Sequence, residues 1–268
     1  MSEEHRPRAQ AFAANDVSRS QPVEAAVRAP TAGAMTANLA TLLNQYFYFM
    51  MSLLVAAVVV YGFSHTVGAN LVHPSSPRPT ILYFHAALFT GWIVFFVSQS
   101  ALIRTRNVKV HQRMGWFGLA LGVAIPIVGV TTAIVMARFR IKEGIQTDAA
   151  QFMIIPLFDM LAFSVAFGLA FYWRKKPEFH RRLILIAGCG LTAAAFFRFP
   201  SSVAPSWFYA GVDVLILLGV TRDLLVTKRI HPVYLYGLPL LMLGQTAAMF
   251  TSLSNSPVWL RIAHAILG

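Results

Sequence analysis

Residues 114–137 read MGWFGLALGVAIPIVGVTTAIVMA, an apolar run with no charged side chain between Arg113 and Arg138. A helix rises about 1.5 Å per residue, so a run of this length crosses the roughly 30 Å hydrocarbon core of a bilayer. The whole chain shares this character, since 57% of its 268 residues are hydrophobic and only 12% are charged. A soluble domain has about 25% charged residues. The sequence therefore predicts an integral membrane protein and excludes a soluble enzyme.

Apolar runs of similar length recur along the chain and predict an all-α polytopic bundle of seven transmembrane helices within 43–252. The expected spans are 45–67, 80–103, 112–136, 149–173, 181–197, 207–225 and 232–251. After the last span, Pro257 suits the first turn of a new helix. This final segment, 253–268, is too short to cross the bilayer and is expected to lie along the outer interface.

Basic residues predict the orientation of the bundle, because Lys and Arg are retained on the cytoplasmic side of short loops. Residues 1–42 show no apolar periodicity and are expected to form a disordered cytoplasmic tail. With this tail and the second, fourth and sixth loops inside, 16 of the 22 basic residues lie on the cytoplasmic face. The prediction is a bacterial inner-membrane protein with its amino terminus in the cytoplasm and its carboxyl terminus in the periplasm.

A histidine opens three of the outward-running helices, each time after an inward helix and a short basic loop. These are His111 in KVHQRMG, His180 in EFHRRLI and His231 in RIHPVYL, and the first two share His-x-Arg. The pattern indicates a weak hairpin duplication. Neutral imidazoles at matching depth are ligands for haem iron or a transition metal. A histidine beside Arg or Lys at a membrane edge is also ordinary interfacial composition, and both interpretations stay open.

Ionisable residues inside the spans form a second set of candidates, one on each inward-running helix. They are His85 in LYFHAALF, Asp159 in PLFDMLAF and Asp213 in AGVDVLIL. An ionisable residue within a membrane is costly and is a functional-site hypothesis by default. His65 and Arg198 are expected in the same outer layer. The sequence thus predicts one outer layer that holds these five side chains, in which His85, Asp159 and Asp213 can converge.

Three functions and one structural role fit this outer cluster. His85, Asp159 and Asp213 are suitable ligands for iron, manganese or zinc, and the same groups can relay protons or hydrogen-bond a quinone head group. The structural alternative is an ion pair between Arg198 and Asp213 across adjacent helices. Asp159, three residues after Pro156, is the strongest candidate because a proline kink frees a backbone carbonyl and can open a cavity.

The segments HAALFTGWIVFFVSQSALI, VHQRMGWFGLALG and FHRRLILIAG resemble the histidine-bearing hairpins of bacterial multi-pass inner-membrane families of unassigned function. More distantly, residues 80–200 are similar to b-type cytochromes of the cytochrome b561 class and to small proteins of haem-copper oxidase assembly. The resemblance implies haem held by paired histidines, with His85 and His65 as an outer pair and His111 and His180 as an inner pair. The b561 class has six spans and holds its ligands deeper in the bilayer.

Three classes of function follow from these patterns. The leading hypothesis is binding of b-type haem, a transition metal or a quinone in a redox or oxidase-maturation role, with quinone or membrane redox proteins as partners. The alternatives are a small proton-coupled transporter and a non-catalytic scaffold subunit of a membrane complex. The sequence has no phosphate-binding loop and no H-E-x-x-H zinc helix, which argues against ATPase and metalloprotease activity. Its basic residues lie in loops between spans, so nucleic acid is not an expected partner.

Overall fold

A computed structural model describes residues 32–145, 148–200 and 208–268, and within these ranges every regular element is a helix. The elements are α1 (Ala32–Ser64), the short π-helix η1 (Gly68–Val72), α2 (Thr80–Arg104), α3 (Val108–Lys142), α4 (Ala149–Phe152), α5 (Ile154–Tyr172), α6 (Pro177–Gly190), α7 (Ala193–Phe196), α8 (Phe208–Thr227), α9 (Pro232–Leu253) and α10 (Pro257–Leu267). The predicted all-α fold class is confirmed.

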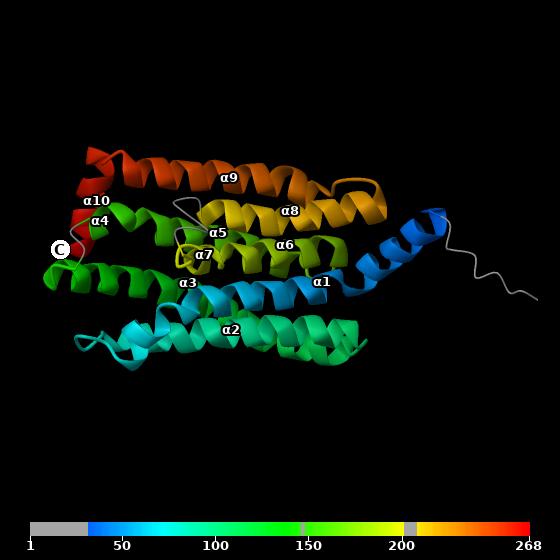
Figure 1. Ribbon diagram of the computed structural model, residues 1–268, viewed down its shortest axis with the longest axis horizontal. Coiled ribbons are helices and arrows are strands. Elements are labelled where there is room, and N and C mark those ends of the chain that lie inside the picture. The colour runs from blue at the N-terminus through cyan, green and yellow to red at the C-terminus, as the bar shows by residue number, and fades with distance from the viewer. Residues whose placement is uncertain (1–31, 146–147, 201–207) are drawn as a thin grey trace, which may run out of the picture.

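The long helices lie along one axis and form a bundle, with α2/α3, α5/α6 and α8/α9 as hairpins (Figure 1). Within the described residues, six segments have the length and apolar composition of membrane spans. They are Ala40–Ser64, Thr80–Arg104, Val108–Lys142, Ala149–Tyr172, Pro177–Phe196 and Pro232–Leu253. The predicted span 207–225 coincides with α8, which packs in the same bundle but carries Asp213, Arg222 and Asp223. The chain is therefore a multi-pass membrane protein.

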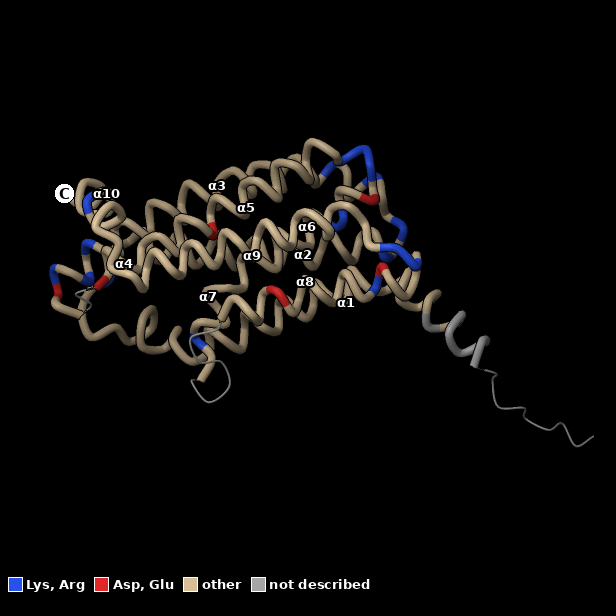
Figure 2. The backbone as a smooth tube through the Cα atoms, turned by 90° about the horizontal axis from the view of Figure 1, so that it is seen from above, with Lys and Arg blue, Asp and Glu red and all other residues tan. Residues whose placement is uncertain are grey.

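Charge separates into two end layers, with few charged residues on the helices between them (Figure 2). We call the end with the α2–α3, α5–α6 and α8–α9 connections the basic end. We call the opposite end, where α10 lies, the α10 end. The basic end holds most of the Lys and Arg residues that the sequence analysis assigned to the cytoplasm, and the sidedness itself stays a prediction.

Two helices are longer than the predicted spans. Helix α1 begins at Ala32, so the predicted disordered tail 1–42 is wrong for residues 32–42; residues 1–31 lie outside the described part. The segment AGAMTANLATL is rich in Ala, Leu and Met, which have high helix propensity, and it projects beyond the bundle (Figure 1). Helix α3 continues to Lys142, so the first half of the segment 137–148, between the predicted third and fourth spans, is helical.

Two predicted spans are each divided into two helices. In the span 149–173, α4 ends at Phe152, whose carbonyl is the one that Pro156 leaves without a helical donor. In the span 181–197, α6 ends at Gly190 and α7 begins at Ala193. Both interruptions lie towards the α10 end. The interrupted backbone is tolerated in a membrane where it is buried in protein or lines a cavity.

An aromatic core joins α2, α3 and α5 on the basic-end side of these interruptions. The ring of Trp92 is 2% exposed and packs edge-on against Phe163 and Phe167, with centroids 5.3 and 5.6 Å away. Gly122 of α3 faces the Phe167 ring so closely that a Cβ would overlap it. Gly118 and Gly122 form a G-x-x-x-G on α3 that allows close packing against aromatic rings, those of Phe95 and Phe167.

Helix α10 confirms the helix predicted after the last span and packs across one end of the bundle (Figure 1). Pro257 is its first residue, and the Ser256 hydroxyl accepts a hydrogen bond from the Trp259 backbone N–H. The Trp259 indole donates to the carbonyls of Ala150 and Gln151 at 3.1 Å. These bonds fix α10 over α4. Its place along a membrane interface stays a prediction.

Candidate functional site

A cavity of about 210 Å³ opens among the helices near the α10 end, and we call it the His85 pocket. Its wall is mostly apolar and comes from α2, α3, α4, α5, α7 and α8. The polar side chains on the wall are His85, Thr132, Arg140, Asp159 and Arg198. The structure therefore places three of the five residues of the predicted outer layer on one pocket wall, namely His85, Asp159 and Arg198. Thr132 and Arg140 lie on the same wall.

Two polar atoms of the pocket residues are buried and have no hydrogen-bond partner within the described chain. They are Nδ1 of His85 and Oγ1 of Thr132. The His85 ring is held in place because it stacks on Phe89 with centroids 4.0 Å apart. Thr132 is 6% exposed and lines the pocket from α3, whereas His85 lines it from α2. Buried polar groups are normally satisfied, so these two atoms point to a ligand or ordered water in the pocket.

Asp159 also lies on the pocket wall and is held by a neighbouring helix. The Tyr209 hydroxyl of α8 donates a hydrogen bond of 2.8 Å to Asp159 Oδ1 on α5. Tyr209 is 8% exposed, so this bond is shielded from water and fixes the carboxyl group. The sequence predicted Asp159, whereas it gave no sign of Tyr209. A partner fifty residues away on another helix is visible only once the helices are packed.

Arg198 and Asp213 do not form the predicted ion pair. The Arg198 guanidinium donates to the Ala194 carbonyl and lies over the Phe63 ring, 4.4 Å from its centroid. Asp213 lies deeper along α8, where the Gln245 side chain is within hydrogen-bonding reach. Its Oδ1 is buried without a partner in the part of the chain that the structure describes. The predicted spans gave the depth of both residues but not the direction in which either side chain points.

The predicted metal set and outer histidine pair are not assembled in this structure. His85, Asp159 and Asp213 do not form a cluster, and the described residues contain no group of three or more His, Cys, Asp or Glu side chains suited to a metal ion. His65 is exposed at the end of α1, and its ring packs edge-on against Tyr61 at 4.9 Å. His65 is therefore outside the His85 pocket, whose wall does not include it.

The predicted inner histidine pair does lie together at the basic end. His111 and His180 occupy the first turns of α3 and α6, and their ring centroids are 6.3 Å apart. His180 Nδ1 is 2.9 Å from the Ala170 carbonyl. His231 stands apart from this pair as the N-cap of α9, where its Nδ1 accepts from the Val233 N–H at 3.2 Å. Each histidine of the predicted repeat thus opens a helix.

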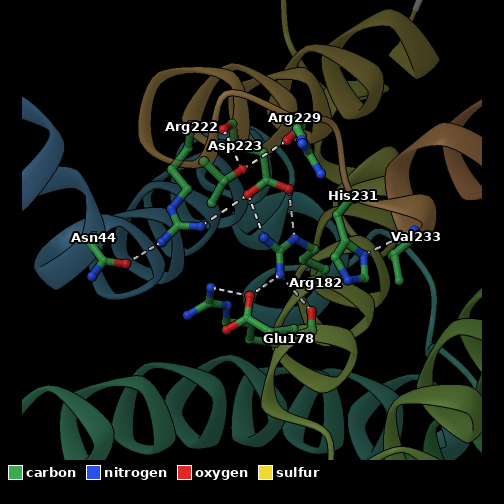
Figure 3. A network of polar contacts seen from close by, with 10 residues as sticks. Asn44, Glu178, Arg182, Arg222, Asp223, Arg229, His231 and Val233 are labelled. Atoms are coloured by element: carbon green, nitrogen blue, oxygen red, sulfur yellow. Dashed lines mark hydrogen bonds and ion pairs between the residues drawn. The ribbon is translucent and has the colours of Figure 1, made fainter.

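A buried ion network at the basic end was not predicted, and we call Asn44, Glu178, Arg182, Arg222 and Asp223 the Arg182 network. Figure 3 shows Arg182 lying between Glu178 and Asp223. Its Nε and Nη2 donate to the two Asp223 oxygens at 2.7 Å, and its Nη1 donates to Glu178 Oε2 at 2.7 Å. Arg182 is 1% exposed and Asp223 is fully buried. Paired donors to one carboxylate give the strong bidentate geometry.

The same network ties α1 to α8. Arg222 Nη1 donates to Asp223 at 3.0 Å, and its Nη2 donates to Asn44 Oδ1 at 2.6 Å (Figure 3). The Tyr48 ring of α1 lies under the guanidinium groups of Arg222 and Arg181, 5.6 and 5.1 Å from its centroid. The charge pattern of the sequence predicts only that these arginines lie on the cytoplasmic face. The available signal was Asp223, a lone acid in an otherwise basic segment.

Comparisons with known proteins add no relative to this description. No family model, no curated protein and no solved structure matches the chain. Two sites of this membrane protein bear on its function. The His85 pocket has polar atoms without partners among the described residues, and the Arg182 network has paired charges.

Proposed function

We propose that this membrane protein binds the head group of an isoprenoid quinone in the His85 pocket. One observation carries the proposal: the buried atoms Nδ1 of His85 and Oγ1 of Thr132 lack partners among the described residues and belong to side chains on the wall of one cavity. A quinone carbonyl accepts hydrogen bonds, and a quinol hydroxyl both donates and accepts them. An imidazole and a hydroxyl can satisfy either form.

The remainder of the wall suits a flat apolar ring. Met136, Phe152, Met153 and Phe208 are among its carbon-rich side chains. Binding sites of this kind are mostly apolar, with a few polar groups that fix the orientation of the ligand. The isoprenoid tail of a quinone would remain in the bilayer. The pocket therefore needs to enclose only the ring and its substituents.

Asp159 gives the pocket a group that can hold a proton. Reduction of a quinone to a quinol takes two electrons and two protons, and the electrons would come from a membrane redox partner. A protonated Asp159 can deliver the first proton to the reduced head group, and the same carboxyl group delivers the second after it has been protonated again. The Tyr209 hydroxyl keeps this carboxyl group in position through its 2.8 Å bond. We assign Asp159 this proton-donor role and Tyr209 a positioning role.

The donor set supports a quinone more strongly than a metal ion or haem at this pocket. The side chains there offer one imidazole and one carboxylate, whereas metal sites in proteins use three or four ligands. The cavity of about 210 Å³ is below the range of roughly 300–1,000 Å³ that is usual for drug-sized ligands. One ring fits such a volume better than a porphyrin does.

Titration of the purified protein in nanodiscs with decylubiquinone tests the proposal. We expect saturable binding at one site per chain. Thr132→Val should weaken binding about tenfold, which corresponds to the loss of one hydrogen bond. The matched control is Thr131→Val, because the adjacent Thr131 is exposed and its hydroxyl already bonds the Ile127 carbonyl at 2.8 Å.

The proposal fails if decylubiquinone does not saturate, or if both valine variants bind it as the wild type does. Oxidised and dithionite-reduced absorption spectra of the same sample, with elemental analysis, test the haem and metal alternatives. A Soret band that is lost in His111→Ala and His180→Ala would move the redox site to the inner histidine pair.

A further inference from the structure

One face of α8 carries polar groups from the His85 pocket to the Arg182 network. This face carries three polar side chains at helical spacing, Tyr209, Asp213 and Asp223. Ile216 and Gly219 lie between the second and the third. Residues three and four apart lie on the same face of a helix. This face is buried, since Tyr209 is 8% exposed and Asp223 is fully buried. The polar groups therefore point into the bundle rather than towards lipid.

Helix α9 supplies two more polar groups that face this side of α8, and we call the contact between α8 and α9 the seam. Gln245 reaches Asp213, and Tyr234 lies eleven residues earlier, three helical turns towards the basic end. Tyr234 is 1% exposed, and its hydroxyl lies against Gly219 of α8. A Cβ at Gly219 would overlap that hydroxyl oxygen, so the glycine makes room for it. The two helices lie side by side in Figure 1.

Several polar atoms along this seam are buried without partners among the described residues. They are Asp213 Oδ1, Tyr234 Oη, Tyr48 Oη and Arg222 Nε. In a membrane an unsatisfied polar group costs several kcal/mol, and ordered water is the usual partner for such groups. If Tyr234 served only for packing, phenylalanine would avoid the free-energy cost of burying an unsatisfied hydroxyl group. Asp213 and Tyr234 thus mark places where water or a passing proton is accommodated.

We propose that the seam between α8 and α9 is a proton path from the basic end to Asp159 in the His85 pocket. A proton enters from water at the basic end and passes the Tyr234 hydroxyl, Asp213 and the Tyr209 hydroxyl. At each step one O–H bond breaks as the next forms, and the net change is one proton moved onto the Asp159 carboxylate. The path deepens the proposed function, because it rests on a quinone as the consumer of that proton.

One section of the path, between Asp213 and Gly219 on α8, has only apolar side chains. Ile216 is fully buried on the same face of α8, and the rise from Asp213 to Gly219 is about 9 Å. A proton can cross this distance only when water enters the section. Conduction is therefore slow at rest, which limits proton leakage across the membrane. Replacing Ile216 by serine should speed it.

Proton flux into reconstituted vesicles tests the path. The His85 pocket is open on one side, so a proton that reaches Asp159 can leave through that opening when no quinone occupies the pocket. The full chain would be placed in phosphatidylcholine vesicles containing pyranine, and a potassium gradient with valinomycin would drive protons inward. We expect flux above that of protein-free vesicles, a fall of about tenfold or more in Tyr234→Phe and Asp213→Asn, and a rise in Ile216→Ser. The matched control is Tyr236→Phe, because Tyr236 is on the same helix and is 70% exposed.

The path is overturned if Tyr234→Phe conducts like the wild type, or if the wild type conducts no faster than empty vesicles. Size-exclusion and thermal unfolding profiles of Tyr234→Phe show whether the variant keeps its fold, and Asp213→Asn gives an independent arm. Decylubiquinone binding by Tyr234→Phe separates the two proposals. If Tyr234→Phe binds decylubiquinone and conducts protons as the wild type does, only the proton path is rejected. If Tyr234→Phe lowers the proton flux but the protein binds no decylubiquinone, only the quinone proposal is rejected.

Discussion

The Arg182 network and the His85 pocket hold most of the ionisable side chains inside this bundle, yet they are organised in opposite ways. In the network, Arg182 and Arg222 surround Asp223 with donors at 2.7 to 3.0 Å. In the pocket, the polar atoms of His85 and Thr132 face a cavity without partners in the described chain. The comparison indicates that paired charges hold helices together, whereas unpaired polar atoms mark the place for a ligand.

The largest expected effect is on the network side. Asp223→Asn removes the only acidic partner that Arg222 has among the described residues and leaves Arg182 with Glu178 alone, and both arginines are 1% exposed. Loss of one partner of a buried ion pair costs about 3–5 kcal/mol. We expect a large fall in Tm in detergent, followed by differential scanning fluorimetry. Asp148→Asn is the control, because Asp148 is exposed outside the network.

Removing the bidentate pair as a whole separates pairing from burial, with Arg222 then held by Asn44 alone within the network. Arg182→Met combined with Asp223→Leu removes both partners of the bidentate pair. Well-packed apolar residues often replace a buried ion pair without loss of stability. The double variant should therefore melt closer to the wild type than Asp223→Asn does. If it melts lower, the network stabilises through something other than charge balance.

Close packing between α8 and α9 gives the next effect in size. Gly219→Ala places a methyl group against the Tyr234 hydroxyl, and overpacking of this kind costs about 1–3 kcal/mol. Tyr234→Phe removes the oxygen and should restore part of the lost stability. Thermal unfolding of the two single variants and the double variant measures the coupling. Additive effects would mean that Gly219 and Tyr234 do not meet.

The sequence predicted the bundle because apolar runs and loop charges are local signals. Such signals predict the long helices, the helix after Pro257 and the pocket residues His85 and Asp159. The partners do not. Arg182 stands in a basic loop pattern that is typical of any cytoplasmic end. Only the packing of α6 against α8 shows that this arginine is buried on Asp223, forty-one residues away.

The same limit explains why Arg198 and Asp213 were wrongly paired. The predicted depth placed them in one layer, and opposite charges in one layer invite pairing. The direction of a side chain depends on the rotation of its helix and on the turns between helices, and Arg198, in the turn after α7, lies over Phe63 of α1. Rotation is set by contacts such as those of Gly122 with Phe167, which no run of apolar residues records.

A smaller contrast exists within the pocket itself. Tyr209→Phe leaves Asp159 without its donor and should cost about 1–3 kcal/mol. Thr132→Val removes a hydroxyl that has no partner in the described chain and should be close to neutral for stability. Unfolding in detergent without quinone compares the two. A Thr132→Val variant that is as unstable as Tyr209→Phe would show that the hydroxyl has a structural role, against the ligand interpretation.

The smallest expected effect belongs to His231, at the edge of the network. Burial, followed by the positive charge of Arg182, lowers the pKa of His231 below its ordinary value. The unfolded chain therefore binds a proton more readily than the folded one, so this residue withdraws stability as the pH falls through about 6.5. Protonation also removes the Nδ1 lone pair that accepts the Val233 N–H.

Asparagine at this position keeps an N-cap acceptor and cannot titrate. Wild-type protein should therefore lose slightly more Tm between pH 7 and pH 5 than His231→Asn does. The other histidines are common to both proteins, so the difference between the two curves isolates this residue. Parallel curves would mean that His231 is solvated, and that the network ends at Asp223 rather than extending to the first turn of α9.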